Sequence, residues 1–142
     1  MNTKQAITAC AFIHKEGKLL IAKRADTKSF LPGKYELLGG HVEFGETMEE
    51  SLVRELNEEL HIDIKVGIPF YAFTYLSDNH TVHNVEVDYF AELVNPQQTI
   101  RLNPEDHSDC KWITADEVDR YFDENDAEKH AVKRGFAIVN TV

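Results

Sequence analysis

The chain has 142 residues, of which 42% are hydrophobic and 28% are charged, and its formal net charge is -10. This length and composition predict one globular domain over residues 1–142 and no membrane partner. The acidic balance argues against a protein that binds DNA or RNA polymers through clustered Lys and Arg, but it is compatible with a small phosphorylated ligand bridged by a divalent cation.

The first part of the chain reads as strands joined by turns. Its N-terminal apolar run is interrupted by Thr8, is too short to cross a membrane and has no signal-peptide cleavage site, so it predicts a strand. Glu16 and Gly17 then mark a hairpin turn. In chain order, we expect strands over 7–13 and 18–24, a loop over 26–34 and a short strand over 35–38.

The segment 47–60 reads as an amphipathic helix. Thr47 and Glu50 form a T-x-x-E capping box, which signals a helix start. The apolar residues of the segment fall within about 100° on a helical wheel and form one stripe. The stripe contains Leu52, Val53, Leu56 and Leu60.

Two further strands follow the helix. The segment 64–76 alternates between apolar and polar residues, but its phase shifts near 67–70, which predicts a bulge. The segment 85–93 alternates cleanly, with apolar residues on one side and mostly acidic residues on the other.

The chain closes with a short strand and a second helix. The strand is expected over 110–113, and the helix near 125–140 has a start signal in Asn125 and Glu128. Strands that both precede and follow one central helix predict an α/β fold in which a mixed sheet lies between helices.

The cysteines indicate the compartment. Cys10 and Cys110 lie far apart in the sequence, and neither belongs to a C-x-x-C pair. Two reduced thiols fit the cytoplasm, so we expect a cytoplasmic protein without a disulfide framework.

The acidic residues of the 47–60 helix are the most unusual chemical feature of the chain. Glu55, Glu58 and Glu59 stand three and four residues apart, so they are neighbours on a helix, where each like-charge pair costs a few tenths of a kcal/mol. Arg54 alone cannot neutralise them, whereas a hard divalent cation such as Mg²⁺ prefers carboxylate oxygens. A solvated glutamate-rich helix face is the alternative that the charge pattern leaves open.

The stretch that contains this helix resembles the Nudix box, the signature of the Nudix hydrolases. The family pattern is Gly, five residues, Glu, seven residues, Arg-Glu, an aliphatic residue, any residue, Glu-Glu, any residue, Gly and an aliphatic residue. His61 stands where the family has its second Gly, just past the helix end, where a left-handed conformation is favoured. The positions that match are Gly40, Glu46, Arg54, Glu55, Leu56, Glu58, Glu59 and Ile62.

The resemblance implies a fold, a reaction and a set of site residues. The fold is the Nudix-type α/β/α sandwich, and the reaction is Mg²⁺-dependent hydrolysis of a phosphoanhydride, with Mn²⁺ as a substitute ion. By resemblance, the metal ligands are Glu55, Glu58, Glu59 and the carbonyl of Gly40, the catalytic residues are Glu58, Glu55 and Arg54, and the supporting residues are Glu46 and Gly39.

The region around the box is similar to the MutT-like members, which hydrolyse nucleoside triphosphates to a monophosphate and pyrophosphate. This resemblance makes Arg24 a phosphate-contacting residue, although a solvated surface role is the alternative. Lys111 precedes Trp112 where some members carry a loop Glu, and Glu105 and His107 stand nearby as substitutes. Oxidised or non-standard nucleotides are candidate substrates, ADP-ribose and dinucleoside polyphosphates are alternatives, and a non-catalytic nucleotide sensor is a third reading.

Other residues are weaker candidates for contact with a base. Asn125 resembles a base-contacting Asn of MutT-like enzymes, but its plainer role is a helix cap. Aromatic side chains could stack on a base, although most strand aromatics are core residues. The aromatic candidates are Phe30, Tyr35, Phe73, Tyr75 and Tyr89. A monomer and a homodimer are both compatible with the sequence.

Overall fold

The computed structural model of the chain describes residues 2–140. Its strands are β1 (Lys4–Lys15), β2 (Lys18–Arg24), β3 (Tyr35–Glu36), β4 (Leu38–His41), β5 (Ile64–Ser77), β6 (Val82–Leu93) and β7 (His107–Ile113). Its helices are α1 (Met48–Leu60), the short α2 (Val118–Tyr121), which follows the 3-10 turn η1 (Ala115–Glu117), and α3 (Ala127–Val139).

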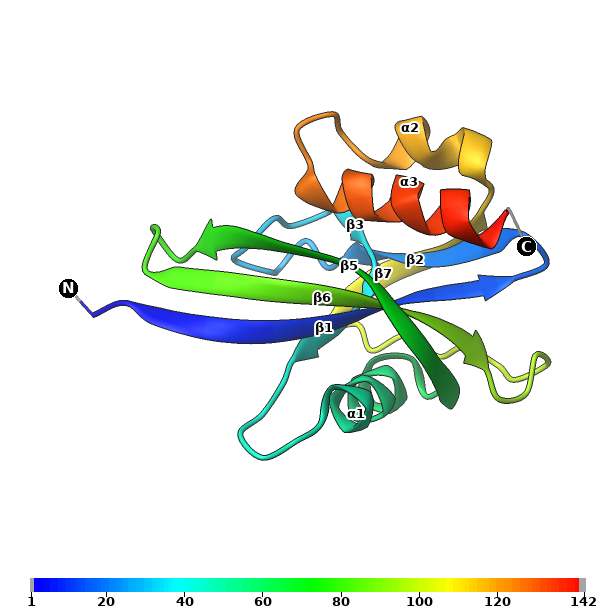
Figure 1. Cartoon of the computed structure of the whole chain (residues 1–142), viewed down its shortest axis with the longest axis horizontal. Helices are drawn as coiled ribbons and strands as arrows, with labels where there is room; N and C mark the ends of the chain where they lie inside the picture. Colours follow the sequence, from blue (N-terminus) through cyan, green and yellow to red (C-terminus); the bar gives the residue numbers. More distant parts are fainter. Residues whose placement is uncertain (1, 141–142) are drawn as a thin grey trace.

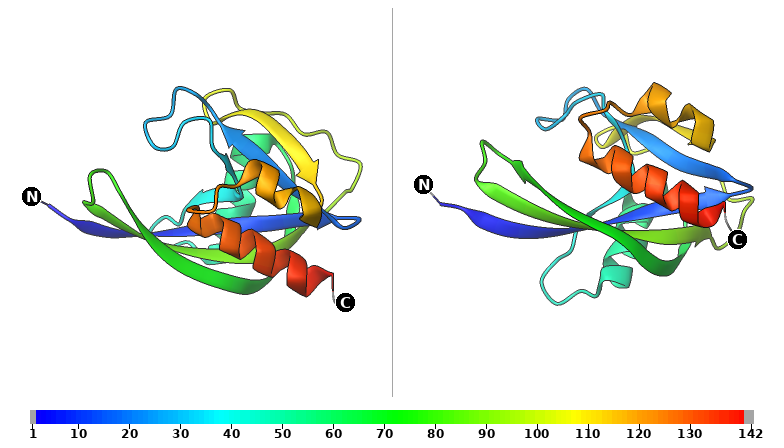
Figure 2. Two further views of the ribbon diagram at one scale, coloured as in Figure 1. Left: turned by 90° about the horizontal axis from the view of Figure 1, so that it is seen from above. Right: turned by 45° about the horizontal axis from the view of Figure 1, so that its top comes forward.

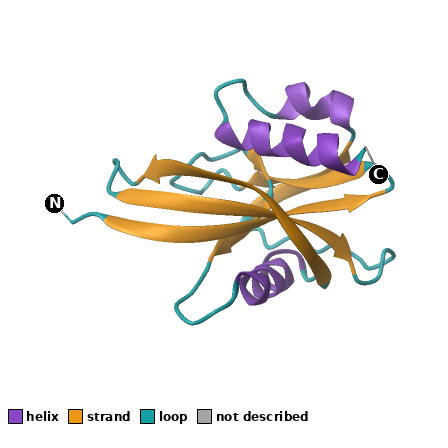
Figure 3. Cartoon of the chain, in the orientation of Figure 1, coloured by secondary structure: helices purple, strands orange, loops and turns teal. Residues whose placement is uncertain are grey.

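The helices lie on both sides of a seven-stranded sheet. Helix α1 covers one side, while α2 and α3 cover the other (Figure 1), and the colouring by secondary structure shows the three layers (Figure 3). The sheet is mixed, because β1 pairs with β6 in parallel and with β2 and β4 in antiparallel fashion. The expected α/β/α sandwich is therefore confirmed. No helix within residues 2–140 combines the length and apolar character needed to span a membrane.

Strand β1 is the centre of the arrangement, because it pairs with β6 on one edge and with β4 and β2 on the other. Cys10 of β1 pairs with Gly39 of β4 on one edge and with Asp88 of β6 on the other. A side chain at Gly39 would collide with the backbone of Ala9 and Cys10. The absence of a side chain at this position is what lets β4 lie against β1 at this point.

Two hydrophobic cores flank the sheet. One joins the apolar stripe of α1 to the inner residues of β1, and it includes Leu52, Leu56 and Leu60 of the predicted stripe but not the exposed Val53. The other is centred on Phe12 and includes Val132 and Phe136 of α3, the helix that crosses over the sheet in the view from above (Figure 2). The ring of Phe12 meets those of Phe70, Phe90 and Phe136 edge to face, with centroids 5.7, 5.6 and 5.1 Å away.

The predicted irregularities of the strands are present, and one burial pattern was not foreseen. The register between β5 and β6 shifts on both sides of Pro69, which confirms the bulge near 67–70. The alternation of β6 is also confirmed, but its acidic side is the buried one. Glu86 is 3% exposed and Asp88 is fully buried, whereas the neighbouring Val85 and Val87 are only partly buried.

The helix ends confirm one predicted cap and correct another. The side chain of Thr47 accepts a hydrogen bond from the backbone N–H of Glu50, and the capping box of α1 is complete. The expected Asn125 cap of α3 was wrong, because Asp126 is the N-cap and accepts from the backbone N–H of Glu128. A cap one residue later leaves the side chain of Asn125 free to line a pocket that is described below.

His61 occupies the left-handed position that ends α1. Its φ is 58° and its ψ is 38°, and its backbone N–H donates to the carbonyl of Asn57. The ring Nδ1 lies 3.0 Å from the carbonyl oxygen of Arg101. This contact compensates in part for a backbone conformation that costs an ordinary residue about 1–2 kcal/mol.

We expect His61→Gly to be more stable than His61→Ala by about 1 kcal/mol, because both lose the contact to Arg101 but only Gly fits the left-handed position without strain. Urea denaturation of the two variants measures the difference in the free energy of unfolding. Equal stability of the two variants would show that the backbone at this position carries no strain.

Candidate active site

A pocket of about 1040 Å³ opens between the β4–α1 region and the start of α3. At one end it is lined by the box residues Gly39, Gly40, Glu55 and Glu59. At the other end it is lined by residues of β1, β6 and α3. That second set includes Thr8, Cys10, Asn84, Glu86 and Glu128.

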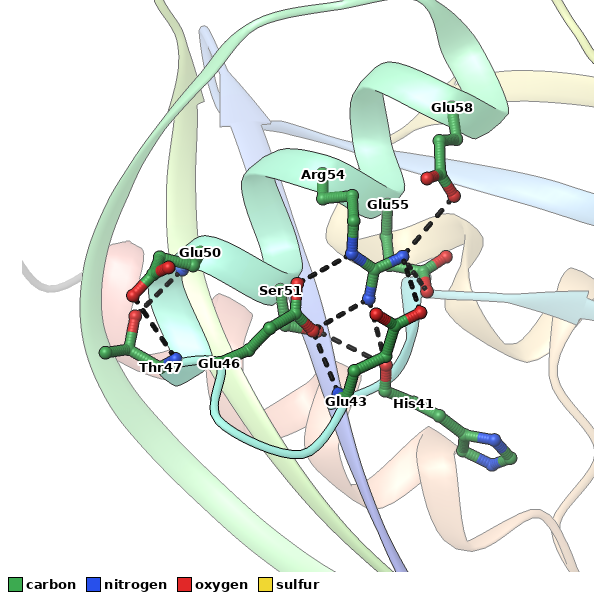
Figure 4. A network of polar contacts seen from close by, with 9 residues as sticks. All are labelled: His41, Glu43, Glu46, Thr47, Glu50, Ser51, Arg54, Glu55 and Glu58. Carbon is green, nitrogen blue, oxygen red and sulfur yellow. Dashed lines mark hydrogen bonds and ion pairs between the residues drawn. The ribbon is translucent and has the colours of Figure 1, made fainter.

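Arg54 is the centre of a polar network at the box end (Figure 4). Its Nε and Nη2 donate to the two carboxylate oxygens of Glu46 at 2.7 and 2.9 Å, which is a bidentate contact. Its Nη1 lies 3.1 Å from Glu55 and 3.4 Å from Glu58, while Nη2 also donates to the carbonyl of His41 at 3.3 Å. One guanidinium therefore ties the loop before α1 to two of the three candidate metal carboxylates.

Glu46 is itself fixed from two directions. Besides Arg54, it accepts a hydrogen bond from the backbone N–H of Glu43 at 2.9 Å. The hydrogen bonds from Arg54, followed by the one from the Glu43 backbone, lower the pKa of Glu46 to about 2. Glu46 therefore holds Arg54 in place across the ordinary pH range.

Glu55 and Glu59 converge inside the pocket. Glu59 is 9% exposed, and its Oε2 has no hydrogen-bond partner among the described residues. Burial and then the adjacent Glu55 raise the pKa of Glu59 to about 10. At Gly40 a Cβ would lie 2.5 Å from the carboxyl carbon of Glu55, so a side chain there would displace that carboxylate.

This donor set fits a hard divalent cation. It offers carboxylate oxygens, one of them buried and unpartnered, beside a backbone that can approach closely because Gly40 has no side chain. Two carboxylates forced together in a buried place repel each other, and a cation between them removes that cost. Glu58 differs from the other two, because its side chain is 59% exposed and lies outside the pocket lining.

Arg24 lines the pocket, but two of its nitrogens are already engaged. Nε donates to the carbonyl of Phe30 at 2.8 Å, and Nη1 lies 3.2 Å from Glu36. Glu36 also contacts His107. Nε2 of His107 lies 2.9 Å from Oε2 of Glu36, and Nδ1 of the same ring lies 3.8 Å from Oε2 of Glu59. A chain of polar contacts thus runs from Arg24 to Glu59, one of the candidate metal carboxylates.

Glu36 was not among the expected site residues, and His107 lies outside the strand expected over 110–113. His107 is the first residue of β7 and is 3% exposed, so it is a buried strand residue beside Glu59. Glu105 is exposed and lies outside the pocket lining. Glu36 belongs to a two-residue strand, and only its register opposite Ala22 of β2 brings it to the site.

A second group of acids comes from β6 and α3. Glu86 and Glu128 line the pocket, whereas Asp88 is fully buried and outside the pocket lining. Ligand atoms of Cys10, Glu86 and Asp88 lie within 4.8 Å of one another. Burial raises the pKa of Glu86 and raises the pKa of Asp88 to about 6. Glu128 accepts from the backbone N–H of Leu37 at 2.8 Å, and burial raises its pKa to about 7.

Aromatic side chains also line the pocket. Tyr89 packs against the α1 core and does not line the pocket. The rings of Phe30 and Tyr75 are stacked, with centroids 6.1 Å apart and an interplanar angle of 13°. The aromatic candidates that do line the pocket are Phe30, Tyr35, Phe73 and Tyr75.

The fold and the box geometry together define a Nudix hydrolase. Residues 3–134 match the NUDIX domain model, so the chain belongs to this family and is an enzyme that acts on phosphoanhydride bonds. It is 29% identical to nucleoside triphosphatase NudI of Enterobacter sp. (strain 638) over 123 residues, which are 81% of this chain and 86% of that protein. It is 27% identical to nucleoside triphosphatase NudI of Escherichia coli O139:H28 over 126 residues, which are 83% of this chain and 88% of that protein.

Solved structures show the same fold. The MutT protein from Methanosarcina mazei Go1 superposes with a TM-score of 0.81 at 19% identity, covering 100% of this chain and 99% of that one. The ORF135 protein of E. coli superposes with a TM-score of 0.74 at 24% identity, covering 98% of this chain and 94% of that one. The recognition of a MutT-like Nudix hydrolase in the sequence is thereby confirmed.

Glu46→Gln tests the ion pair with Arg54 through its pH dependence. The folded pKa of about 2 lies below the usual 4.5, so the charged form stabilises the fold above pH 4.5 and this contribution is lost as the pH falls toward 2. The stability difference between the natural chain and Glu46→Gln should be constant near pH 7 and shrink between pH 4.5 and 2. Denaturation at pH 7, 4 and 3 measures it, and a difference that is independent of pH would contradict the assignment.

Proposed function

We propose that this chain, acting as one hydrolase domain, converts a nucleoside triphosphate to the monophosphate and pyrophosphate in the presence of Mg²⁺. The observation that carries the proposal is the convergence of Glu55, Glu59 and Gly40 at one end of a pocket that is large enough for a nucleotide. The names of the curated relatives, which are nucleoside triphosphatases, support the same substrate class.

The residues proposed to hold Mg²⁺, or Mn²⁺ in its place, are Glu55, Glu58, Glu59 and the Gly40 carbonyl. When bound, the ion neutralises charge on the phosphates and lowers the pKa of water. Glu58 is solvent-exposed and tied to Arg54 only at 3.4 Å, so it is free to turn toward the pocket. We assign to Glu58 the acceptance of the proton from the attacking water, with Glu55 as its partner.

The remaining box residues position these groups. Arg54 orients Glu55 and Glu58 through the contacts described above, and Glu46 holds Arg54 by both oxygens. Gly39 keeps β4 against β1. Arg24 stands in the pocket wall, and its Nη2 has no hydrogen-bond partner among the described residues. We propose that it contacts a phosphate of the substrate.

Phosphoanhydride hydrolysis needs little covalent work from a protein. It needs a positioned water, a nearby base and neutralisation of the phosphate charge, and the proposed carboxylates would meet these needs with a bound cation and Arg54. The net charge of -10 repels a free triphosphate, so the cation also makes substrate entry electrostatically feasible.

Product analysis tests the reaction. Incubation with Mg²⁺ and a panel of nucleoside triphosphates, oxidised ones included, should release pyrophosphate and a monophosphate, and a chelator should stop the release. ADP-ribose and diadenosine polyphosphates belong in the panel as the alternative substrates. AMP and ribose phosphate from ADP-ribose, without cleavage of triphosphates, would replace the proposal, and no cleavage of any member would favour a nucleotide sensor.

Glu58→Gln should lower kcat at least about a hundredfold, because it removes a proton acceptor and a metal ligand while keeping the shape of the side chain. Glu49→Gln is the matched control, because it removes the same charge from an exposed position of the same helix and should leave kcat unchanged. Steady-state pyrophosphate release measures both variants. Equal rates for a folded Glu58→Gln variant and its control would remove Glu58 from the mechanism.

The cell compartment and the assembly belong to the same proposal. Cys10 and Cys110 are both free thiols, which fits the reducing cytoplasm. We propose a cytoplasmic enzyme whose partner is a small nucleotide rather than a nucleic acid polymer, active as a monomer or a homodimer.

A further inference from the structure

The side chains of Glu59 and His107 face each other in the wall of the pocket, and both are buried. Oε2 of Glu59 and Nδ1 of His107 have no hydrogen-bond partner among the described residues, and these two atoms lie 3.8 Å apart. Buried polar atoms that stay unpaired are costly, so two of them side by side form a pair that a small movement completes. A shift of about 1 Å brings them to ordinary hydrogen-bond distance.

The other nitrogen of the same ring is already engaged. Nε2 of His107 lies 2.9 Å from Oε2 of Glu36. An ionised carboxylate only accepts hydrogen bonds, so Nε2 carries the hydrogen of this contact. Nδ1 is therefore the ring atom left for Glu59, and one proton between Nδ1 and Oε2 joins the two side chains, whichever atom carries it. The ring cannot turn away from Glu59 without losing Glu36.

The backbone holds the two residues in a fixed relation. The backbone N–H of Asn103 donates to the carbonyl of Glu59 at 3.1 Å, and the N–H of His107 donates to the carbonyl of Asn103 at 3.0 Å. The N–H of Arg101 donates to the carbonyl of Leu60 at 3.0 Å. Two of these bonds satisfy carbonyls that the end of a helix leaves free. The last turn of α1 and the first residue of β7 are thus attached to the same segment.

We propose that His107 is a positioning residue for the metal site, because it holds Oε2 of Glu59 and leaves the other carboxylate oxygen to the cation. Glu36 in turn holds the ring of His107. A ligand that is oriented before the ion arrives binds it more tightly than one that must be ordered by it. This inference rests on the proposed function, since it takes Glu59 to be a metal ligand.

Asn and Gln at position 107 separate the two sides of the ring. Asn can place an amide N–H near the position of Nδ1, where it faces Glu59, but it is too short to reach Glu36. Gln can reach Glu36 near the position of Nε2 and leaves the position of Nδ1 empty. Both variants remove the ring, so a role in packing alone would affect them alike.

Mn²⁺ alone, without nucleotide, is the probe, and electron paramagnetic resonance measures the free ion. His107→Gln should raise the Kd for Mn²⁺ at least about tenfold over the natural chain, the size expected when a group that holds a ligand is lost. His107→Asn should raise it less than about threefold, because a donor to Glu59 remains. Equal Kd values for the two variants would overturn the proposal.

Variants of Glu36 test the same role without changing the buried ring. Glu36→Gln keeps an acceptor for Nε2 of His107 and should leave the Kd for Mn²⁺ within about threefold of the natural value. Glu36→Leu has a similar volume without an acceptor and should raise the Kd well beyond that of Glu36→Gln. Urea denaturation of the metal-free variants shows which of them are folded. Equal Kd values for folded Glu36→Gln and Glu36→Leu would show that the ring needs no anchor, and would overturn the role of Glu36.

Separate measurements distinguish failure of this inference from failure of the proposed function. Release of pyrophosphate from triphosphates by the natural chain, with one Kd for Mn²⁺ in all four variants, would refute the positioning role and keep the proposed function. The expected order of Kd values in a chain that cleaves no triphosphate would refute the proposed function and keep the positioning role. A natural chain that binds no Mn²⁺ would refute both.

Discussion

The bidentate ion pair between Arg54 and Glu46 is the contact on which the geometry of the active site depends. Seven carboxylates crowd the stretch from Gly39 to Ile62, and Arg54 is the one Lys or Arg side chain among them. Because Glu46 holds two of its nitrogens, the third nitrogen is directed to Glu55 and Glu58 rather than to solvent. The loop before α1 and the helix itself are thereby fixed relative to each other at the place where the phosphates are proposed to bind.

The features that the sequence predicted correctly are those that depend on near neighbours in the chain. The capping box needs only Thr47 and Glu50, and the spacing of the box glutamates is set by the helix itself. The left-handed turn at His61 follows from its place after the last helical residue. The wrong cap at Asn125 shows the limit of such local signals, because Asp126 satisfies the same pattern one residue later.

The features that the sequence did not predict depend on strand pairing over long distances. His107 reaches Glu59 only because β7 pairs with β2, and Glu36 reaches His107 only because β3 pairs with the same strand. An alternating strand usually turns its polar side to water. In β6, Glu86 and Asp88 are buried instead, Glu86 in the wall of the pocket, and only the packing of the folded chain reveals this.

The burial of these acids changes the effective charge that a ligand meets. A formal count assigns every carboxylate a full negative charge at pH 7, which gives the chain its value of -10. Burial raises the pKa of Glu86 well above its usual range and raises the pKa of Glu128 to about 7, so this part of the pocket wall is closer to neutral than the count suggests. An anionic molecule that enters from solvent therefore passes from a strongly acidic surface into a weaker electrostatic field, and the repulsion that it meets decreases with depth.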